Sequence, residues 1–121
     1  MQLGLFKDAV QYFSSAVRLR PRNVSGWEAL IRCLYKGDFT DEAMEQVDAA
    51  LQVTNGKPIF LFYKASILLL MGKSKEAVLQ LEKAMAQAPK LLRKFIELNP
   101  ASLQNQLVVD VVARFKRNRS I

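Results

Sequence analysis

A 34-residue repeat restricts the possible folds of this 121-residue chain more than any other feature. Each copy has an alanine, a bulky apolar residue four positions later and a second alanine three positions after that. The copies are Ala9, Phe13 and Ala16; Ala43, Val47 and Ala50; and Ala77, Leu81 and Ala84. These spacings place all three side chains on one helix face, where alanine lets a neighbouring helix approach closely and the bulky residue fills the groove between helices. Because one such unit cannot bury its apolar face alone, the repeat predicts a stack of helices.

Residues that begin and end helices divide the chain into seven expected helices. Gly37 follows an apolar helical segment and suits the end of a helix, whereas Pro58 suits a first helical turn. Thr40, Ser74 and Asn99 are of the type that caps helix N-termini. We expect helices over residues 4–20, 24–36, 40–54, 58–71, 74–87, 90–98 and 101–117. No segment shows the alternating pattern of a strand, so the fold class predicted is all-α.

The order of small and bulky residues within each period resembles the tetratricopeptide repeat. The second unit carries Trp27, Leu30, Leu34, Gly37, Ala43, Val47 and Ala50 at the signature positions of that family, and the third carries Leu61, Ala65, Leu68, Gly72, Ala77, Leu81, Ala84 and Pro89. The resemblance covers residues 1–89. It implies a right-handed superhelical solenoid of antiparallel helix pairs, with residues 1–23 as the second half of repeat one, 24–57 as repeat two and 58–89 as repeat three.

The two ends of the chain differ from a full repeat. Residues 90–121 carry two apolar helical stripes and no clear fourth repeat, so we expect a two-helix C-terminal cap that hides the last apolar face. Met1 falls inside the first repeat, whose leading helix is almost wholly missing. We therefore expect a fragment of a longer repeat protein, or an unusual natural start, in which Ala9, Phe13 and Ala16 are partly uncovered. The C-terminal segment also resembles the ends of many bacterial proteins of this family.

The composition argues against an enzyme. The sequence has no His and one Cys, Cys33, so His/Cys zinc sites, disulfide frameworks and Ser–His or Cys–His pairs are excluded. The five glycines are dispersed and form no phosphate-binding loop. We predict no catalytic residues, no metal and no cofactor. The longest apolar run, residues 67–71, is too short to span a membrane, and without a targeting signal we expect a cytoplasmic protein.

The resemblance implies a binding groove, because in this family the first helix of each repeat lines a concave surface that takes extended peptides or helices. The positions that carry over are Ser25, Glu28, Ala29, Arg32, Tyr35 and Lys36 in the second unit, and Ile59, Phe62, Tyr63, Ser66, Leu69 and Leu70 in the third. The third-unit set is apolar and aromatic, which favours an interaction site with aromatic anchors and with Arg32 as the polar group that orients the partner. The alternative is that another helix, such as 101–117, or a second copy covers it. The leading hypothesis is a non-enzymatic scaffold that binds a protein or peptide.

Charge suggests a second hypothesis. The chain has 18 Lys and Arg against 11 Asp and Glu, and residues 90–121 alone hold seven basic and two acidic residues. The basic residues are Lys90, Arg93, Lys94, Arg114, Lys116, Arg117 and Arg119. They could bind nucleic acid or an anionic surface, or serve only as solvated helix ends. We do not expect nucleic acid to be the partner, since Phe95 and Phe115 are expected in the core and no base-reading motif is present. A third possibility is self-association as a homodimer.

Overall fold

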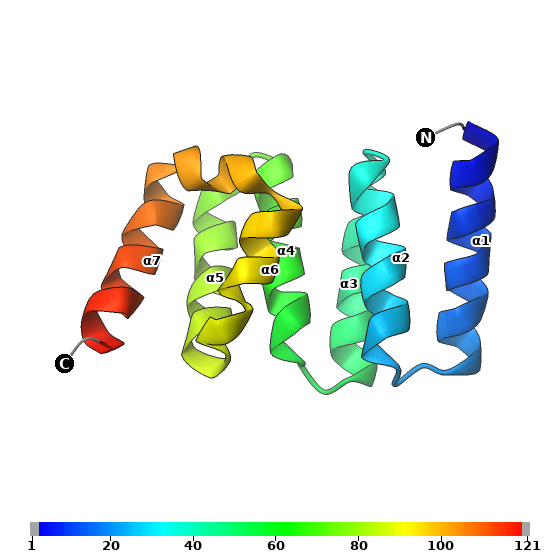
Figure 1. The fold of residues 1–121 in the computed structure, drawn as a ribbon, viewed down its shortest axis with the longest axis horizontal. Coiled ribbons are helices and arrows are strands. Elements are labelled where there is room, and N and C mark those ends of the chain that lie inside the picture. The colour runs from blue at the N-terminus through cyan, green and yellow to red at the C-terminus, as the bar shows by residue number, and fades with distance from the viewer. Residues whose placement is uncertain (1–2, 120–121) are drawn as a thin grey trace.

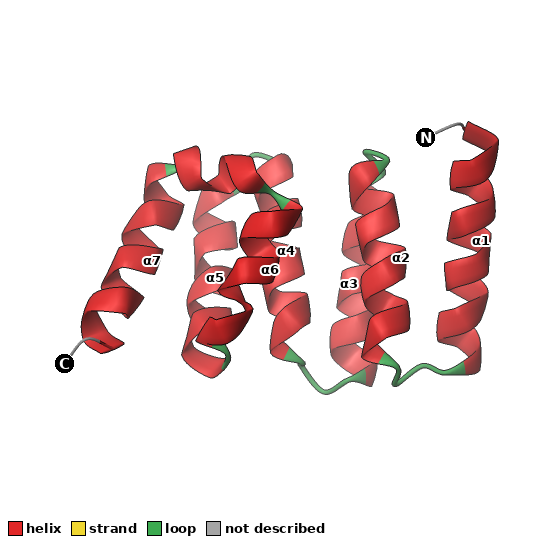
Figure 2. Ribbon diagram, in the orientation of Figure 1, coloured by secondary structure: helices red, strands yellow, loops and turns green. Residues whose placement is uncertain are grey.

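The computed structural model describes residues 3–119 and contains only helices and turns over that range (Figure 2). The helices are α1 (Leu3–Leu19), α2 (Val24–Lys36), α3 (Thr40–Val53), α4 (Pro58–Leu70), α5 (Ser74–Gln87), α6 (Leu92–Leu98) and α7 (Gln106–Arg119). Two 3-10 helices, Pro89–Leu91 and Pro100–Gln104, precede α6 and α7. The all-α prediction is confirmed.

The helices form an elongated row, with α1 at one end and α7 at the other (Figure 1). Each of the first four helices packs against the next one in the sequence, while α6 packs on α4 and α7 packs on α5. In Figure 1, α6 lies in front of α4 and α5, and the ribbons of α2 and α3 stand between it and α1. The architecture is therefore repeat-like, with α6 added on one face of the row.

Burial follows the 34-residue period, but not equally in the three copies. The alanines and the bulky apolar residue of the second and third copies, on α3 and α5, are almost completely buried. In contrast, Ala9, Phe13 and Ala16 on α1 are only partly buried. The expectation that these three side chains are partly uncovered is confirmed. A helix face that is closed on α3 and α5 thus remains open on α1.

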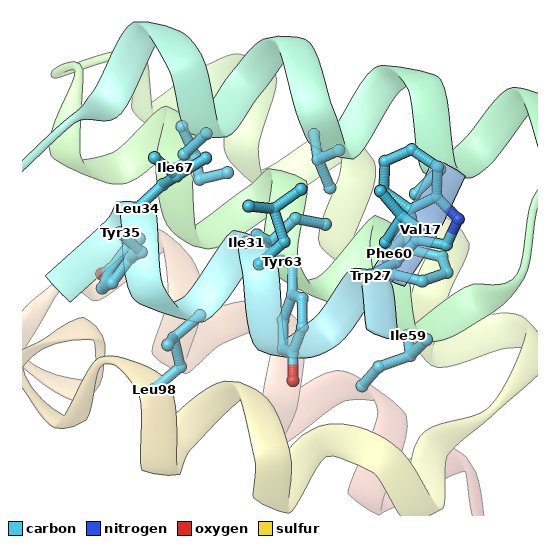
Figure 3. Packing of buried hydrophobic residues seen from close by; sticks show 14 of the residues in the cluster. Val17, Trp27, Ile31, Leu34, Tyr35, Ile59, Phe60, Tyr63, Ile67 and Leu98 are labelled. Atoms are coloured by element: carbon cyan, nitrogen blue, oxygen red, sulfur yellow. The ribbon is translucent and has the colours of Figure 1, made fainter. Parts of the chain in front are cut away.

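Two apolar clusters hold the row together, and α6 contributes to both. The first cluster joins α2, α3 and α4 around Trp27, Ile31, Phe60 and Tyr63, and it includes Leu98 of α6 (Figure 3). The second cluster joins α4, α5, α6 and α7 and contains Phe62, Leu81, Phe95, Val108 and Val111. Because α6 adds to both clusters, it is an integral part of the packed core.

The turn after α2 shows why two adjacent residues have different requirements. Asp38, not Gly37, adopts the left-handed conformation, with φ 65°. Gly37 has φ −86°, and its role is steric, since a Cβ there would overlap the ring of Phe6. Phe6 in turn stacks on Phe39, with ring centroids 5.0 Å apart. Gly37 therefore permits α1 to pack closely against the α2–α3 turn.

Three cap predictions are wrong. Thr40 and Ser74 are the first residues of α3 and α5, and no side chain makes a capping hydrogen bond at either N-terminus. Instead, Ser74 Oγ accepts a hydrogen bond from Asn105 Nδ2 at 3.2 Å. Asn99 precedes a 3-10 helix and makes no capping bond.

The last helix also begins later than predicted, at residue 106 instead of 101. Asn105 Oδ1 accepts a hydrogen bond from the backbone N–H of Leu107 at 2.9 Å, which is the interaction of an N-cap residue. This capping contact places the start of the helix after Asn105 and leaves Pro100–Gln104 as a 3-10 helix.

The burial of the repeat alanines generates a stability prediction. We expect Ala43→Leu and Ala77→Leu each to lower the free energy of unfolding by about 1–3 kcal/mol, because extra methylene groups have no room in a packed interface. Urea denaturation measures the effect. Ala86→Leu, at an exposed position of α5, is the matched control and is expected to have little effect. Equal unfolding of all variants and the parent chain would contradict the register of the repeat.

Candidate interaction site

The aromatic side chains predicted to line the groove on the third unit are buried. Phe62 and Ser66 are 0% exposed and Tyr63 is 1% exposed. Ile59 and Tyr35 are also buried, and Leu69 is partly buried. Of the two alternatives left open for the third-unit face, the burial of these residues supports a covered face, although Leu70 remains 47% exposed. Tyr35 of the second unit is covered as well.

Helix α6 is the element that covers this face. Its Phe95 ring lies against Phe62, with centroids 6.2 Å apart, and its Leu98 belongs to the cluster that contains Tyr63. The covering helix expected as the alternative was 101–117. Helix α7 instead packs on α5 and reaches only the cluster around Phe62. The chain thus uses residues 92–98 to fill the part of its own surface that offered aromatic anchors.

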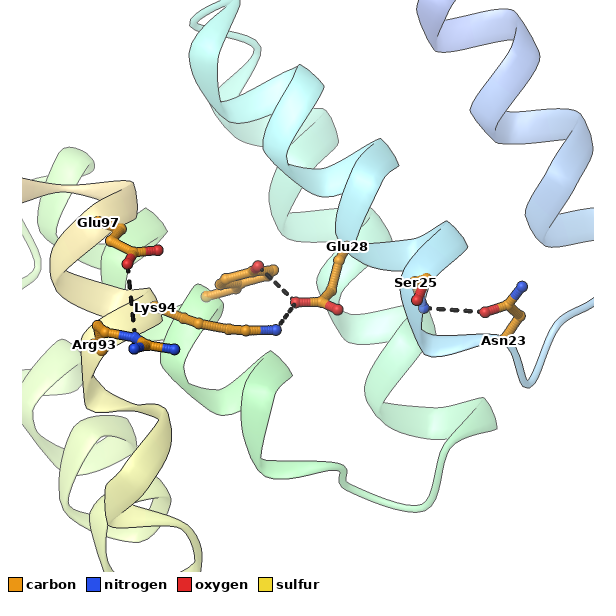
Figure 4. A network of polar contacts seen from close by, with 7 residues as sticks. Asn23, Ser25, Glu28, Arg93, Lys94 and Glu97 are labelled. Carbon is orange, nitrogen blue, oxygen red and sulfur yellow. Dashed lines mark hydrogen bonds and ion pairs between the residues drawn. The ribbon is translucent and has the colours of Figure 1, made fainter.

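A polar network ties α6 to α2 and α4 at the edge of the apolar contact (Figure 4). Glu28 on α2 accepts a hydrogen bond from the hydroxyl of Tyr63 at 2.9 Å. It also accepts a hydrogen bond from Lys94 Nζ at 3.2 Å, and this contact is an ion pair. The Glu28 side chain is only 16% exposed, so both contacts compensate a carboxylate that has lost most of its water. A second hydrogen bond, donated by Ser66 Oγ to the Tyr35 hydroxyl at 3.0 Å, joins α4 to α2.

Burial raises the pKa of both tyrosines in this network. For Tyr63 the largest cause is loss of water, and the Glu28 carboxylate raises the pKa further because it stabilises the protonated phenol and repels the phenolate. Arg32 acts in the opposite direction. For Tyr35, burial dominates over the hydrogen bond from Ser66, which lowers the pKa. Both phenols therefore remain protonated at pH values where a free tyrosine begins to ionise.

A cleft of about 450 Å³ lies between α1, α2 and α6. Its half-buried lining is apolar, with Ala9 and Phe13 from α1 and Ala29 and Cys33 from α2. The polar and charged residues that also line it are Ser25, Glu28, Arg32, Lys36 and Lys94. All of the second-unit positions taken from the family groove, except Tyr35, line this cleft. It also contains Lys94, which the sequence placed in a separate basic patch.

The basic residues near the C-terminus do not gather on one helix. Lys90, Arg93 and Lys94 belong to Pro89–Leu91 and α6, whereas Arg114, Lys116 and Arg117 belong to α7; the side chain of Arg119 lies outside the described part of the structure. Ion pairs join Arg93 to Glu97 at 3.7 Å, Lys94 to Glu28 at 3.2 Å and Arg114 to Glu82 at 3.1 Å. These pairs reduce the positive charge available to a phosphate-bearing partner.

The described residues contain no cluster of three or more metal-binding Cys, Asp or Glu side chains. Burial raises the pKa of the Cys33 thiol, which disfavours the reactive thiolate.

Within residues 3–119, every helix is too short or too polar to cross a bilayer. No family model matches the chain, and no curated protein matches it either. The cleft between α1, α2 and α6 is therefore the candidate site.

The cleft was only partly visible in the sequence. The open positions Ala9 and Phe13 followed from the incomplete first repeat, and the α2 residues followed from the family groove. The position of α6 beside them did not, because residues 90–98 show only an apolar stripe and no indication of where it packs. Lys94 therefore could not be assigned to this site from the sequence.

Two variants of α6 separate its apolar from its ionic contacts. We expect Phe95→Ala to lower the free energy of unfolding by about 3–5 kcal/mol, because it removes a fully buried ring from the second cluster. We expect Lys94→Ala to cost less than about 1 kcal/mol, because the Lys94 side chain is 44% exposed. Chemical denaturation of both variants tests this order. A larger cost for Lys94→Ala would show that charge, and not apolar packing, holds α6.

The raised tyrosine pKa values predict loss of stability in alkali. The unfolded chain ionises its tyrosines near pH 10, whereas folded Tyr63 and Tyr35 ionise only at higher pH. Folded-state stability is therefore fully present below about pH 10 and falls as the pH rises above it, because the unfolded chain releases these protons first. Denaturation at increasing pH should show a smaller decline for Tyr63→Phe, a variant that has lost one of the two phenols. An identical decline in the variant and the parent chain would contradict the assigned shift of Tyr63.

Proposed function

We propose that residues 1–89 form tetratricopeptide-like repeats capped by residues 90–119, and that this module is a non-enzymatic scaffold that binds a helix of another protein. The binding site proposed is the cleft between α1, α2 and α6. The single observation that carries the proposal is the incomplete burial of Ala9, Phe13 and Ala16 on α1. The corresponding faces of α3 and α5 are closed.

The repeat explains why a helix is the ligand that fits. On α3, the face formed by Ala43, Val47 and Ala50 is covered within the cluster that includes α2. The same face on α1 is only partly buried and borders the cleft through Ala9 and Phe13. A helix in that position would meet the small–bulky–small surface that the chain already uses for its own helix pairs. Helix-in-groove binding relies on this type of packing.

The charges of the cleft indicate the chemistry of the bound helix. Arg32, Lys36 and Lys94 are exposed along the cleft. The one carboxylate that lines it, Glu28, is already bonded to Tyr63 and Lys94. The favoured partner is therefore an amphipathic helix with a small apolar face and acidic residues at its edges. Apolar contacts would supply most of its affinity, and the cations would orient it.

Capture of a partner from a source lysate tests the proposal. The intact chain should retain a discrete protein through a high-salt wash, because burial of an apolar helix face depends little on ionic strength. We expect Ala29→Glu to abolish this capture, since it places bulk and charge in the half-buried part of the cleft. The captured protein should bind through a segment that becomes helical in circular dichroism.

Ala86→Glu is the matched control, because it makes the same change on an exposed helix position away from the cleft. It should leave capture intact. Capture that survives Ala29→Glu would overturn the assignment of the cleft. Retention of only nucleic acid or lipid, released as the salt concentration rises, would favour the basic residues of α6 and α7 instead.

A further inference from the structure

Helix α1 carries an apolar stripe whose bulky members are exposed and which shares Ala9 and Ala16 with the partly buried face described above. The stripe consists of Leu5, Ala9, Tyr12, Ala16 and Leu19, whose spacings alternate between four and three residues. Leu5, Tyr12 and Leu19 are 61%, 71% and 83% exposed. Alternating spacings of this kind produce the straight seam along which two helices pack over their length. Bulky and small residues alternate along this seam.

The stripe is separate from the face that holds α1 in the fold. The residue that follows each of the first four stripe positions faces the core instead. Of these residues, Phe6 and Val17 belong to the first apolar cluster, and Val10 and Phe13 pack against it. The charged residues of α1, Lys7, Asp8 and Arg18, lie between the stripe positions and not on them. An uncharged apolar seam of this length outside the packed face of a helix is typical of an interface.

Comparison with the other two repeats shows that the second copy keeps two of these three bulky apolar residues and that the third copy keeps none. Residues 34 positions after Leu5, Tyr12 and Leu19 are Phe39, Gln46 and Val53. Residues 68 positions after them are Lys73, Gln80 and Gln87. The third copy is thus fully polar where the first is fully apolar. The 34-residue register alone does not require the bulky apolar side chains on α1.

We infer that the stripe is the interface of a homodimer in which α1 pairs with α1 of a second copy in antiparallel orientation. An overlap of residues 3–18 of the two helices places Leu5 against the partner's Ala16 and Tyr12 against the partner's Ala9, and it leaves Leu19 outside these layers. By two-fold symmetry, each copy contributes the same contacts. Every bulky residue in these layers meets an alanine, so the two helices can approach closely without leaving gaps.

The self-complementary pattern is what favours a second copy as the occupant. In a parallel pair, Leu5 would face Leu5 and Ala9 would face Ala9, so the bulky layers would hold the helices apart and the alanine layers would be left empty. The antiparallel pair satisfies all four central layers with one sequence. Because a single helix pair buries less area than a standard interface, we expect a dissociation constant on the order of 10 μM.

Sedimentation equilibrium of the intact chain tests the dimer. The parent chain should associate to a dimer over the micromolar range, and Tyr12→Glu should weaken association by at least about thirtyfold, the loss typical of a central interface aromatic. Gln11→Glu is the matched control, since it adds the same charge at the adjacent exposed position outside the stripe. Circular dichroism should show unchanged helicity in both variants, because neither residue is buried.

Three results would overturn the proposal. The parent chain could remain a monomer throughout, which would leave the stripe to a different protein. The dimer could survive Tyr12→Glu, or Gln11→Glu could disrupt it equally. The cleft variant Ala29→Glu should leave the dimer intact, so that failure of the dimer and failure of the proposed partner site give different results.

Cysteine cross-linking then tests the orientation. In a Cys33→Ser background, a mixture of Leu5→Cys and Ala16→Cys chains should form the mixed disulfide dimer on mild oxidation. Neither variant alone should form a disulfide dimer. Efficient cross-linking of Leu5→Cys to itself would indicate a parallel pair and would overturn the antiparallel arrangement.

Discussion

The packing of Phe95 and Leu98 on the face formed by α2 and α4 is the interaction on which the accessible surface of this protein depends. It contributes to the burial of Phe62 and Tyr63 on α4. It also brings Lys94 to Glu28 and so forms one wall of the cleft beside α1. The position of α6 therefore determines which part of the surface of the row remains accessible to another molecule.

The energetic division of this contact is unequal. Buried aromatic and aliphatic side chains supply most of the stability, since each removes a large apolar area from water. The Lys94–Glu28–Tyr63 network lies at the border of the apolar contact, where partial exposure limits the contribution of the ion pair. Its main effect is to satisfy a nearly buried carboxylate and so fix the direction in which α6 crosses α2 and α4. Apolar packing thus provides the stability, and the polar contacts provide the position.

The sequence predicted the first five helices to within one residue at each end, because their repeat pattern and local turn signals agree. It also predicted the partial exposure of Ala9, Phe13 and Ala16 on α1. It left open whether Phe62 and Tyr63 are covered, because their burial depends on a segment about 30 residues away. Local periodicity shows that residues 90–98 have an apolar face but not which surface that face covers. The start of α7 was misplaced for a similar reason, because Asn105 competes with Pro100 as the helix start and only the observed hydrogen bond decides between them.

Hydroxyl-radical footprinting of the intact chain, read out by mass spectrometry, tests most directly whether α6 closes the α4 face. Tyr12 is an internal reference, because it is 71% exposed in the same molecule. The account predicts rapid oxidation of Tyr12 and strong protection of Phe62, Tyr63 and Phe95. Oxidation of Tyr63 and Phe62 at a rate close to that of Tyr12 would show that α6 does not cover them, and it would return the aromatic face of α4 to the open surface of the protein.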